Sequence, residues 1–147
     1  MGTVNYIPEG FQAVTPYFVV PDGPAFMNFL ARAFGAEQIS VHKTPDGAIM
    51  HAEMRLGGAI IELGQANSQW AAMRLNTHVY VPDTDATYQR ALDAGAKSLR
   101  PPKDEFYGDR TAGIEDPAGN FWWIATHIEN VSREELTRRS ATQDAHG

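Results

Sequence analysis

The chain begins with a short run of apolar residues, continues with apolar positions that recur with period 3.6, and then returns to short runs typical of strands. Residues 13–20 are rich in β-branched and aromatic side chains, although Pro16 restricts this strand to a sheet edge or a bulge. Phe26, Leu30 and Phe34 then recur at helical spacing. We therefore expect a first half made of a strand at 13–20, a helix at 24–34, and strands at 37–43, 49–56 and 59–64.

The same order of periods returns in the second half. Tyr88 and Leu92 share one face of a predicted helix that ends at Gly95. We expect a strand at 77–81, a helix at 84–94, and strands at 97–100, 111–115 and 121–127. Ser132-Arg133-Glu134-Glu135 is a capping box, which predicts a terminal helix at about 132–139.

Turn-forming residues separate these elements. Thr44-Pro45-Asp46-Gly47 and Asp116-Pro117-Ala118-Gly119 place Pro and Gly where a type I turn favours them. Gly57-Gly58 suits a primed hairpin turn. Each turn is expected to join two neighbouring strands of one sheet.

The two halves are related by an internal repeat. Val20-Pro21-Asp22 returns as Val81-Pro82-Asp83, 61 positions later, and each helix that follows ends in Gly-Ala. Such self-similarity indicates duplication of one structural unit. The sequence thus predicts an α+β protein made of two βαβββ modules, at about 13–65 and 75–128. We expect these modules and the C-terminal helix to form a single domain over residues 1–147.

The composition excludes several classes of function. The 147 residues carry a formal net charge of −6 and 43% apolar residues, so the chain should fold and should repel nucleic acid and anionic lipid. The absence of cysteine excludes disulfides, thiol nucleophiles and Cys-ligated metals. Apolar runs are too short to span a membrane, and nucleotide-binding glycine motifs are missing. We expect a cytoplasmic protein that acts on a small molecule.

Three motifs carry a resemblance to a known family. Residues 29–36, Ile49-Met50-His51-Ala52-Glu53 and Asp116-Pro117-Ala118-Gly119-Asn120 resemble the glyoxalase/bleomycin-resistance/extradiol-dioxygenase superfamily, also called vicinal oxygen chelate proteins. Within it, Tyr107-Gly108-Asp109-Arg110 and the terminal helix are similar to the PhnB-like branch. The resemblance implies a curled mixed sheet around a cavity, with helices outside, and a homodimer.

The resemblance also implies where a metal would be held. Metal enzymes of the superfamily place ligands on the first and last strand of each half, which correspond here to Thr15, Glu62, Asn76 and Trp123. Only Glu62 is a credible ligand among these four. His78 lies two residues beyond Asn76 and, by strand alternation, on the same face, so Glu62 and His78 can form a shifted site. We expect no native cofactor, with a divalent metal as the alternative.

The predicted cavity is lined by aromatic and polar side chains. Strand alternation directs five ligand-binding candidates toward it: Tyr17, Tyr80, Trp123, Phe121 and Asn76. Two further candidates are Arg110, a candidate for anion binding, and Trp70, in the linker between the halves. Trp123 either offers a stacking platform or fills the barrel. Arg110 either binds a ligand carboxylate or phosphate, or pairs with Glu115 or Glu53.

The strand at 49–56 adds two further candidates. His51 and Glu53 share one face with Arg55, whereas Met50, Ala52, Met54 and Leu56 share the other, which we expect under the helix. His51 can act as a base oriented by Glu53, or both can belong to a solvated polar ladder or a subunit interface. The catalytic candidates are therefore Glu62, His78, His51 and Glu53.

Three functional hypotheses follow. The leading one is a metal-independent small-molecule-binding protein with an aromatic pocket, of the type that sequesters drugs or metabolites and confers antibiotic resistance. The second is a metal-dependent lyase, isomerase or dioxygenase that uses Glu62 and His78. The third is a regulatory or partner-binding module on the same scaffold.

Overall fold

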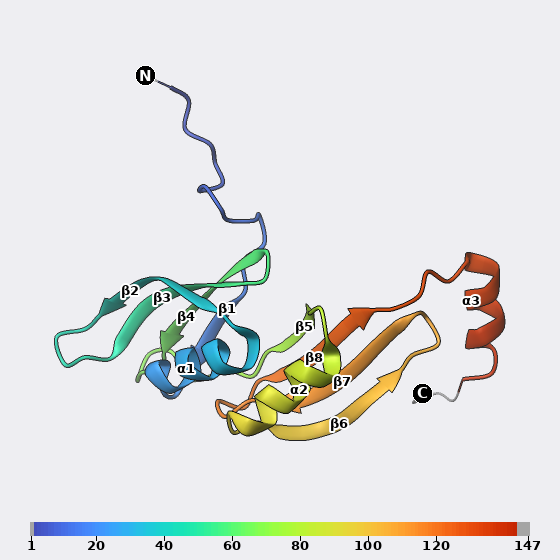
Figure 1. Cartoon of the computed structure of the whole chain (residues 1–147). Coiled ribbons are helices and arrows are strands. Elements are labelled where there is room, and N and C mark those ends of the chain that lie inside the picture. Colours follow the sequence, from blue (N-terminus) through green and yellow to red (C-terminus); the bar gives the residue numbers. More distant parts are fainter. Residues whose placement is uncertain (1, 144–147) are drawn as a thin grey trace.

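The computed structural model describes residues 2–143 and contains two four-stranded mixed sheets (Figure 1). Sheet A has the order β1-β4-β3-β2, and β1 runs parallel to β4 whereas the other neighbours are antiparallel. Its strands are β1 (Tyr17–Val20), β2 (Glu37–Lys43), β3 (Ile49–Leu56) and β4 (Ala59–Gln65), with helix α1 (Gly23–Phe34) between β1 and β2.

Sheet B repeats this topology with the order β5-β8-β7-β6. Its strands are β5 (Asn76–Tyr80), β6 (Lys97–Asp104), β7 (Asp109–Glu115) and β8 (Phe121–His127), with helix α2 (Thr84–Asp93) between β5 and β6. Helix α3 (Arg133–Ser140) follows. The predicted pair of βαβββ modules is confirmed, and the two sheets are not closed into a barrel.

The predicted helix boundaries rest on capping side chains. Asp22 and Asp83 occupy the same position before α1 and α2, and each carboxylate accepts a hydrogen bond from a backbone N–H of the first turn. Helix α1 ends at Gly35, whose φ of 68° places it in the left-handed region that glycine adopts without strain. Ser132 caps α3 in the same way.

One hydrophobic core joins the two modules. Helices α1 and α2 lie side by side on one side of the sheets (Figure 1), and Arg90 Nε donates to the Ala33 carbonyl oxygen at 3.3 Å. Phe18 of β1 stacks on Trp122 of β8, with ring centroids 5.4 Å apart. The indole N–H of Trp122 donates to Asp116 at 2.8 Å, which satisfies the only polar atom of this buried side chain. Strand alternation places six residues beneath the helices, of which five are buried and Val81 is partly buried: Phe18, Val20, Val79, Val81, Trp122 and Ile124.

Strands β1 and β6 differ most from their predicted extents, and both lie at sheet edges. Strand β1 begins at Tyr17, directly after Pro16, and not at residue 13. The side chain of Gln12 takes over the hydrogen bonds that a longer β1 would form with Ile60. Its Nε2 donates to the Ile60 carbonyl, and its Oε1 accepts from the Ile60 N–H. Strand β6 continues through Pro101-Pro102, where the register with β7 shifts. An edge strand tolerates these prolines since one of its sides needs no N–H donor.

The expected placement of Met50 under the helix is wrong. Met50 is 58% exposed, and Ile49 is buried in its place. The register between β2 and β3 shifts between His42 and Lys43, so the first residues of β3 are rotated relative to the regular alternation. Met50 consequently lies on the face of sheet A opposite α1, which we call the open face.

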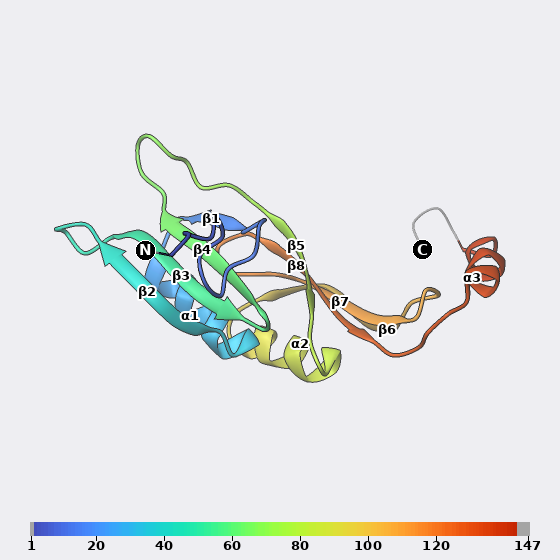
Figure 2. The ribbon, with the colours of Figure 1, turned by 90° about the horizontal axis from the view of Figure 1, so that it is seen from above.

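Helix α3 stands apart from both sheets at one end of the molecule (Figure 2). It buries no residue and is held by Arg139, which pairs with Glu129 at 2.8 Å and donates to the Phe106 carbonyl. Within residues 2–143, none of the helices combines the length and the apolar character needed to span a membrane.

The shared core predicts that both modules unfold together. Phe18→Ala removes a fully buried ring from the contact between β1 and β8, and should lower the free energy of unfolding by about 3–5 kcal/mol. Urea unfolding followed by circular dichroism measures the loss and should show a single transition. Ile39→Ala, at a 41% exposed position, is the control and should change the value by less than about 1 kcal/mol. A similar small change for Phe18→Ala would contradict the shared core.

Candidate functional site

The open face of sheet A, opposite α1, carries a row of polar side chains across all four strands. Tyr17 of β1 pairs in register with Glu62 of β4, Glu62 with Glu53 of β3, and Glu53 with Ser40 of β2. Since cross-strand neighbours on one face lie within contact distance, the register itself brings the two glutamates together. The Ser40 hydroxyl donates to Glu53 Oε1 at 2.5 Å.

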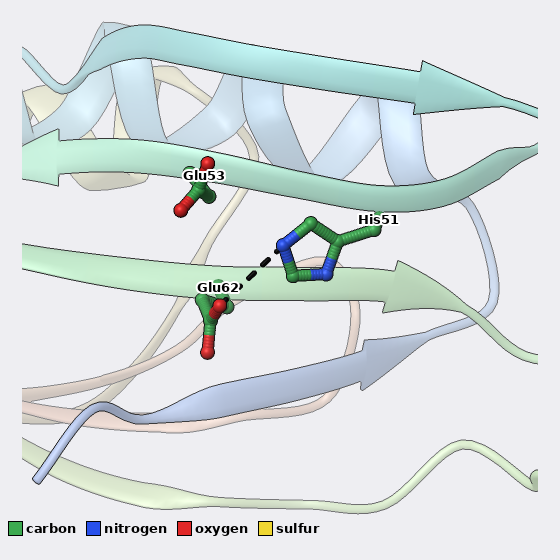
Figure 3. Close-up of side chains that lie close together, drawn as sticks. All are labelled: His51, Glu53 and Glu62. Carbon is green, nitrogen blue, oxygen red and sulfur yellow. Dashed lines mark ion pairs between the residues drawn. The ribbon is translucent and has the colours of Figure 1, made fainter. Parts of the chain in front are cut away.

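His51 joins the two glutamates to form a compact cluster (Figure 3). Its Nε2 lies 3.4 Å from Glu62 Oε1, and one ligand atom from each of His51, Glu53 and Glu62 lies within 4.8 Å of the other two. The side chains of His51 and Glu62 are 33% and 26% exposed, so the cluster is partly shielded from water yet remains accessible. These residue types provide one imidazole nitrogen and two carboxylates, which can bind a cation or exchange a proton.

Tyr17 borders this cluster. Its ring lies over Gly64 of β4, where a Cβ atom would collide with the phenol oxygen, and its centroid is 5.8 Å from that of His51. Burial, followed by the nearby Glu62 carboxylate, raises the pKa of Tyr17, so its hydroxyl stays protonated at neutral pH. On its other side, Tyr17 lines a pocket of about 300 Å³ together with Met50 and Trp70.

The segment before β1 lines a cavity together with the two glutamates. A cavity of about 450 Å³ has Glu53 and Glu62 among its lining residues, and most of the others come from this segment: Tyr6, Ile7, Pro8, Phe11, Gln12, Ala13 and Thr15. The two hydrogen bonds of Gln12 to Ile60 attach the segment to β4. Two of the predicted catalytic candidates therefore lie at a cavity formed within the first module.

The open face of sheet B carries the aromatic side chain of Trp123 beside the Arg100 guanidinium. The Trp123 ring lies across Gly113 of the neighbouring strand β7, in space that a Cβ atom at Gly113 would occupy. Its Nε1 donates to Asn76 Oδ1 at 3.2 Å, and the Arg100 guanidinium carbon lies 5.7 Å from the ring centroid. The half-buried indole is thus held flat against the sheet.

His78 and Tyr80 lie beside Trp123 on this second sheet. His78 is the register partner of Trp123, and the His78 and Tyr80 ring centroids are 4.9 Å apart. Both line a groove of about 270 Å³ that the Gly57-Gly58 turn of the first module borders. Within residues 2–143, the cluster of ligand-type side chains around Glu62 contains His51 and Glu53 and does not include His78.

The buried carboxylate of Asp109 joins two side chains of sheet B through hydrogen bonds. Asp109 is 3% exposed and accepts hydrogen bonds from the Tyr80 hydroxyl at 2.8 Å and, at 2.7 Å, from His127 Nδ1 in its protonated form. The His127 Nε2 lies 2.8 Å from Asn130 Oδ1. The hydrogen bond to Asp109 raises the pKa of Tyr80, and the bonds to Asp109 and Asn130 raise that of His127.

Two other candidates are engaged by neighbouring groups. Arg110 pairs with Asp85 through two bonds of 2.6 and 2.9 Å and with Asp104 at 3.0 Å, so the alternative of a pairing with Glu115 or Glu53 is wrong, and ligand binding by Arg110 stays a prediction. Asp85 lies in the first turn of α2, which packs on β7, and this helix position could not be located from strand alternation. Phe121 lies beneath the Arg74 guanidinium, whose carbon is 4.1 Å from the ring centroid.

Several residues that shape these faces have only weak signals in the sequence. Gly64 and Gly113 read as ordinary strand glycines, although a strand glycine indicates close approach of another group. Neither Gln12 nor Ser40 belongs to a sequence motif, and the contacts of both depend on the pairing of segments that are distant along the chain. Asp109 belongs to a motif at 107–110, yet its bond to His127 depends on the register of β7 and β8.

Comparison with known proteins agrees with this fold. Residues 11–124 match the family model described as Glyoxalase/Bleomycin resistance protein/Dioxygenase superfamily. An uncharacterized protein of Mycobacterium bovis is 30% identical over 142 residues, which cover 89% of this chain and 93% of that protein.

Solved structures share the architecture. TioX from Micromonospora sp. ML1 has a TM-score of 0.68 at 23% identity, over 80% of this chain and 99% of that one. A glyoxalase/bleomycin resistance protein/dioxygenase from Nocardioides has a TM-score of 0.59 at 21% identity, over 89% and 90% of the two chains. At these identities the likeness concerns the fold.

The Asp109–His127 pair predicts a pH-dependent stability. His127 has a pKa above its ordinary value of 6.5 in the folded state, so protonation favours folding. This contribution is complete below the unfolded pKa and is lost as pH rises through the folded pKa. His127→Gln should therefore destabilise the protein more at about pH 5.5 than at about pH 9, as measured by urea unfolding. His78→Gln is the control, and an equal loss at both pH values for His127→Gln would contradict the prediction.

Proposed function

The chain belongs to the glyoxalase/bleomycin resistance protein/dioxygenase superfamily, and we propose that within it this protein binds a planar small molecule by stacking on Trp123. The observation that carries the proposal is the position of the Trp123 ring across Gly113. An indole in this position offers a flat contact surface and needs little reorganisation when a ligand arrives. The proposal extends to drug or metabolite sequestration, as in antibiotic resistance, and to membership of the PhnB-like branch.

The surroundings of Trp123 support a ligand site. Asn76 fixes the indole nitrogen, so the ring is held in one orientation. His78 and Tyr80 add two exposed rings along β5, and Tyr80 is 61% exposed. A surface with several accessible rings and a few oriented polar groups is typical of small-molecule sites. The net charge of −6 disfavours an anionic ligand at long range, whereas the Arg100 guanidinium supplies a positive charge beside the ring.

The contact with Trp123 needs no metal ion. Of the four positions at which the family resemblance places ligands, Asn76 and Trp123 bond to one another, and Thr15 donates to the Gln12 carbonyl at 3.2 Å. Only Glu62 offers a carboxylate. These residues do not fit a metal held by the first and last strands of both halves, so we propose that stacking at Trp123 is metal-independent.

A metal-dependent lyase, isomerase or dioxygenase is the second candidate function. The proximity of His51 and Glu53 to Glu62 favours it, because these three side chains can hold a metal ion or transfer a proton. The pairing of Glu62 with His78 is not favoured, since His78 lies on sheet B and packs against Tyr80.

We also propose that two copies of the chain form a homodimer. Large apolar side chains are exposed on and beside the open faces, namely Tyr17, Met50, Trp70, Met73 and Tyr80. Monomeric proteins rarely leave such groups uncovered, and an open sheet face of a second copy would bury them. The ligand site would then be completed by the contact between copies.

Stacking on Trp123 can be tested with proflavine, a planar cationic dye whose fluorescence anisotropy reports binding. Trp123→Ala should weaken proflavine binding about tenfold, the typical contribution of one aromatic stack. Gly113→Ala should weaken it too, because the added methyl group collides with the indole. A metal chelator should leave the affinity of the wild-type protein unchanged.

Trp70→Ala is the matched control, because Trp70 is a 63% exposed tryptophan that lines a pocket on sheet A. It should retain most of the proflavine affinity. Unchanged binding in Trp123→Ala, or complete loss of wild-type binding upon chelation, would contradict the proposal. Circular dichroism of each variant verifies that the fold is kept.

The homodimer predicts a mass in solution of twice the 16.2 kDa of one chain. Size-exclusion chromatography with light scattering measures this mass directly. Tyr80→Lys places a charge on the open face of sheet B and should shift the equilibrium toward the monomer. The control is Ile39→Lys, at a partly exposed position of β2, which should leave the mass unchanged. A wild-type mass of a single chain at high concentration would argue against the dimer.

A further inference from the structure

We propose that His51, Glu53 and Glu62 bind one divalent cation on the open face of sheet A. This site is different from the pairing of Glu62 with His78, and it takes two of its three ligands from β3, inside the sheet. It deepens the second candidate function, which rests on the same three side chains, and it is independent of ligand binding at Trp123, because Trp123 lies on sheet B.

The geometry of the three side chains fits a cation. Ligand atoms of one ion lie about 3–4 Å apart when each bond is about 2.0–2.2 Å long. His51 Nε2 and Glu62 Oε1 already lie 3.4 Å apart, and all three ligand atoms lie within 4.8 Å of one another (Figure 3). The backbone positions are set by strand pairing, since Glu53 and Glu62 are direct register partners. Small rotations of the glutamate side chains are enough to close the remaining distance.

The local charge also favours a cation. Glu53 and Glu62 face one another across neighbouring strands, where like charges destabilise a sheet. Neither carboxylate forms a salt bridge with a lysine or arginine in the region the structure describes, residues 2–143. Glu62 Oε1 lies 3.4 Å from His51 Nε2, and Glu53 accepts a hydrogen bond from Ser40. A divalent cation between the carboxylates would convert their repulsion into attraction.

The donor set indicates which cations are suitable. One imidazole nitrogen and two carboxylates suit first-row ions such as Zn²⁺, Mn²⁺ or Fe²⁺, whereas Mg²⁺ and Ca²⁺ prefer oxygen ligands alone. Three protein ligands leave further coordination positions for water or a ligand. Glu53 and Glu62 both line the cavity of about 450 Å³, so a small molecule with oxygen donors could reach the ion from there.

Isothermal titration calorimetry of the full-length protein, after removal of metal with a chelator, tests the site. Zn²⁺ and Mn²⁺ are the probes. We expect one equivalent of Zn²⁺ per chain in the wild-type protein. His51→Ala, Glu53→Gln and Glu62→Gln should each weaken binding at least about tenfold, because each removes one of three ligands. Zn²⁺ should also raise the melting temperature of the wild-type protein and not that of the variants.

Two matched variants separate this site from general binding by surface histidines and carboxylates. Glu115→Gln changes a glutamate on β7, the second-module counterpart of β3, and His78→Gln changes an exposed histidine on β5. Both should keep the wild-type stoichiometry and affinity. The proposal is wrong if the wild-type protein binds no stoichiometric Zn²⁺. It is also wrong if Glu53→Gln and Glu62→Gln bind as well as the wild-type protein, or if the two matched variants lose binding equally.

Trp123→Ala distinguishes this inference from the proposed function. We expect it to lose proflavine affinity and to keep Zn²⁺ binding unchanged, whereas Glu53→Gln should do the reverse. Loss of Zn²⁺ binding in Trp123→Ala would contradict a site confined to sheet A. Unfolding midpoints without metal verify that each variant is folded, and the melting-temperature shift of the wild-type protein provides evidence that requires no variant.

Discussion

The stacking of Phe18 on Trp122 is the contact on which the arrangement of the two modules depends. It joins β1 of one sheet to β8 of the other within a core that α1 and α2 cover from one side. Because side chains alternate along a strand, burying Phe18 and Trp122 directs Tyr17 and Trp123 to the opposite faces. The core therefore leaves both open faces available for binding.

The open faces diverge in chemistry although the modules share their topology. At corresponding places on the last strand, one module carries Glu62 and the other Trp123. In each sheet a ring lies over a strand glycine, Tyr17 over Gly64 and Trp123 over Gly113. Sheet A thereby presents carboxylates and imidazole beside a phenol, whereas sheet B presents a flat indole beside the Arg100 guanidinium. These two environments suit a cation and a planar molecule respectively, which is why we assign them different ligands.

Much of the fold could be predicted from individual residues, and the errors share one cause. Asp22, Asp83 and Ser132 cap their helices as expected, since capping depends on residues within one turn. The outward position of Met50 and the ion-pair partners of Arg110 were not predicted, because both depend on distant parts of the chain. A register shift with β2 rotates Met50 outward, and the packing of α2 brings Asp85 to Arg110. Strand alternation contains neither kind of information.

For the candidate site, the sequence alone determined which face of its strand each residue occupies. The repeat and the alternation of side chains placed Glu62 and Trp123 on open faces and Phe18 and Trp122 in the core. Only the tertiary structure decided which of these residues meet. Glu62 lies with His51 and Glu53, not with His78, because β3 is the hydrogen-bonded neighbour of β4 whereas β5 belongs to the other sheet. Side-chain direction is a local property of the backbone, but proximity is set by strand order and register, which long-range packing determines.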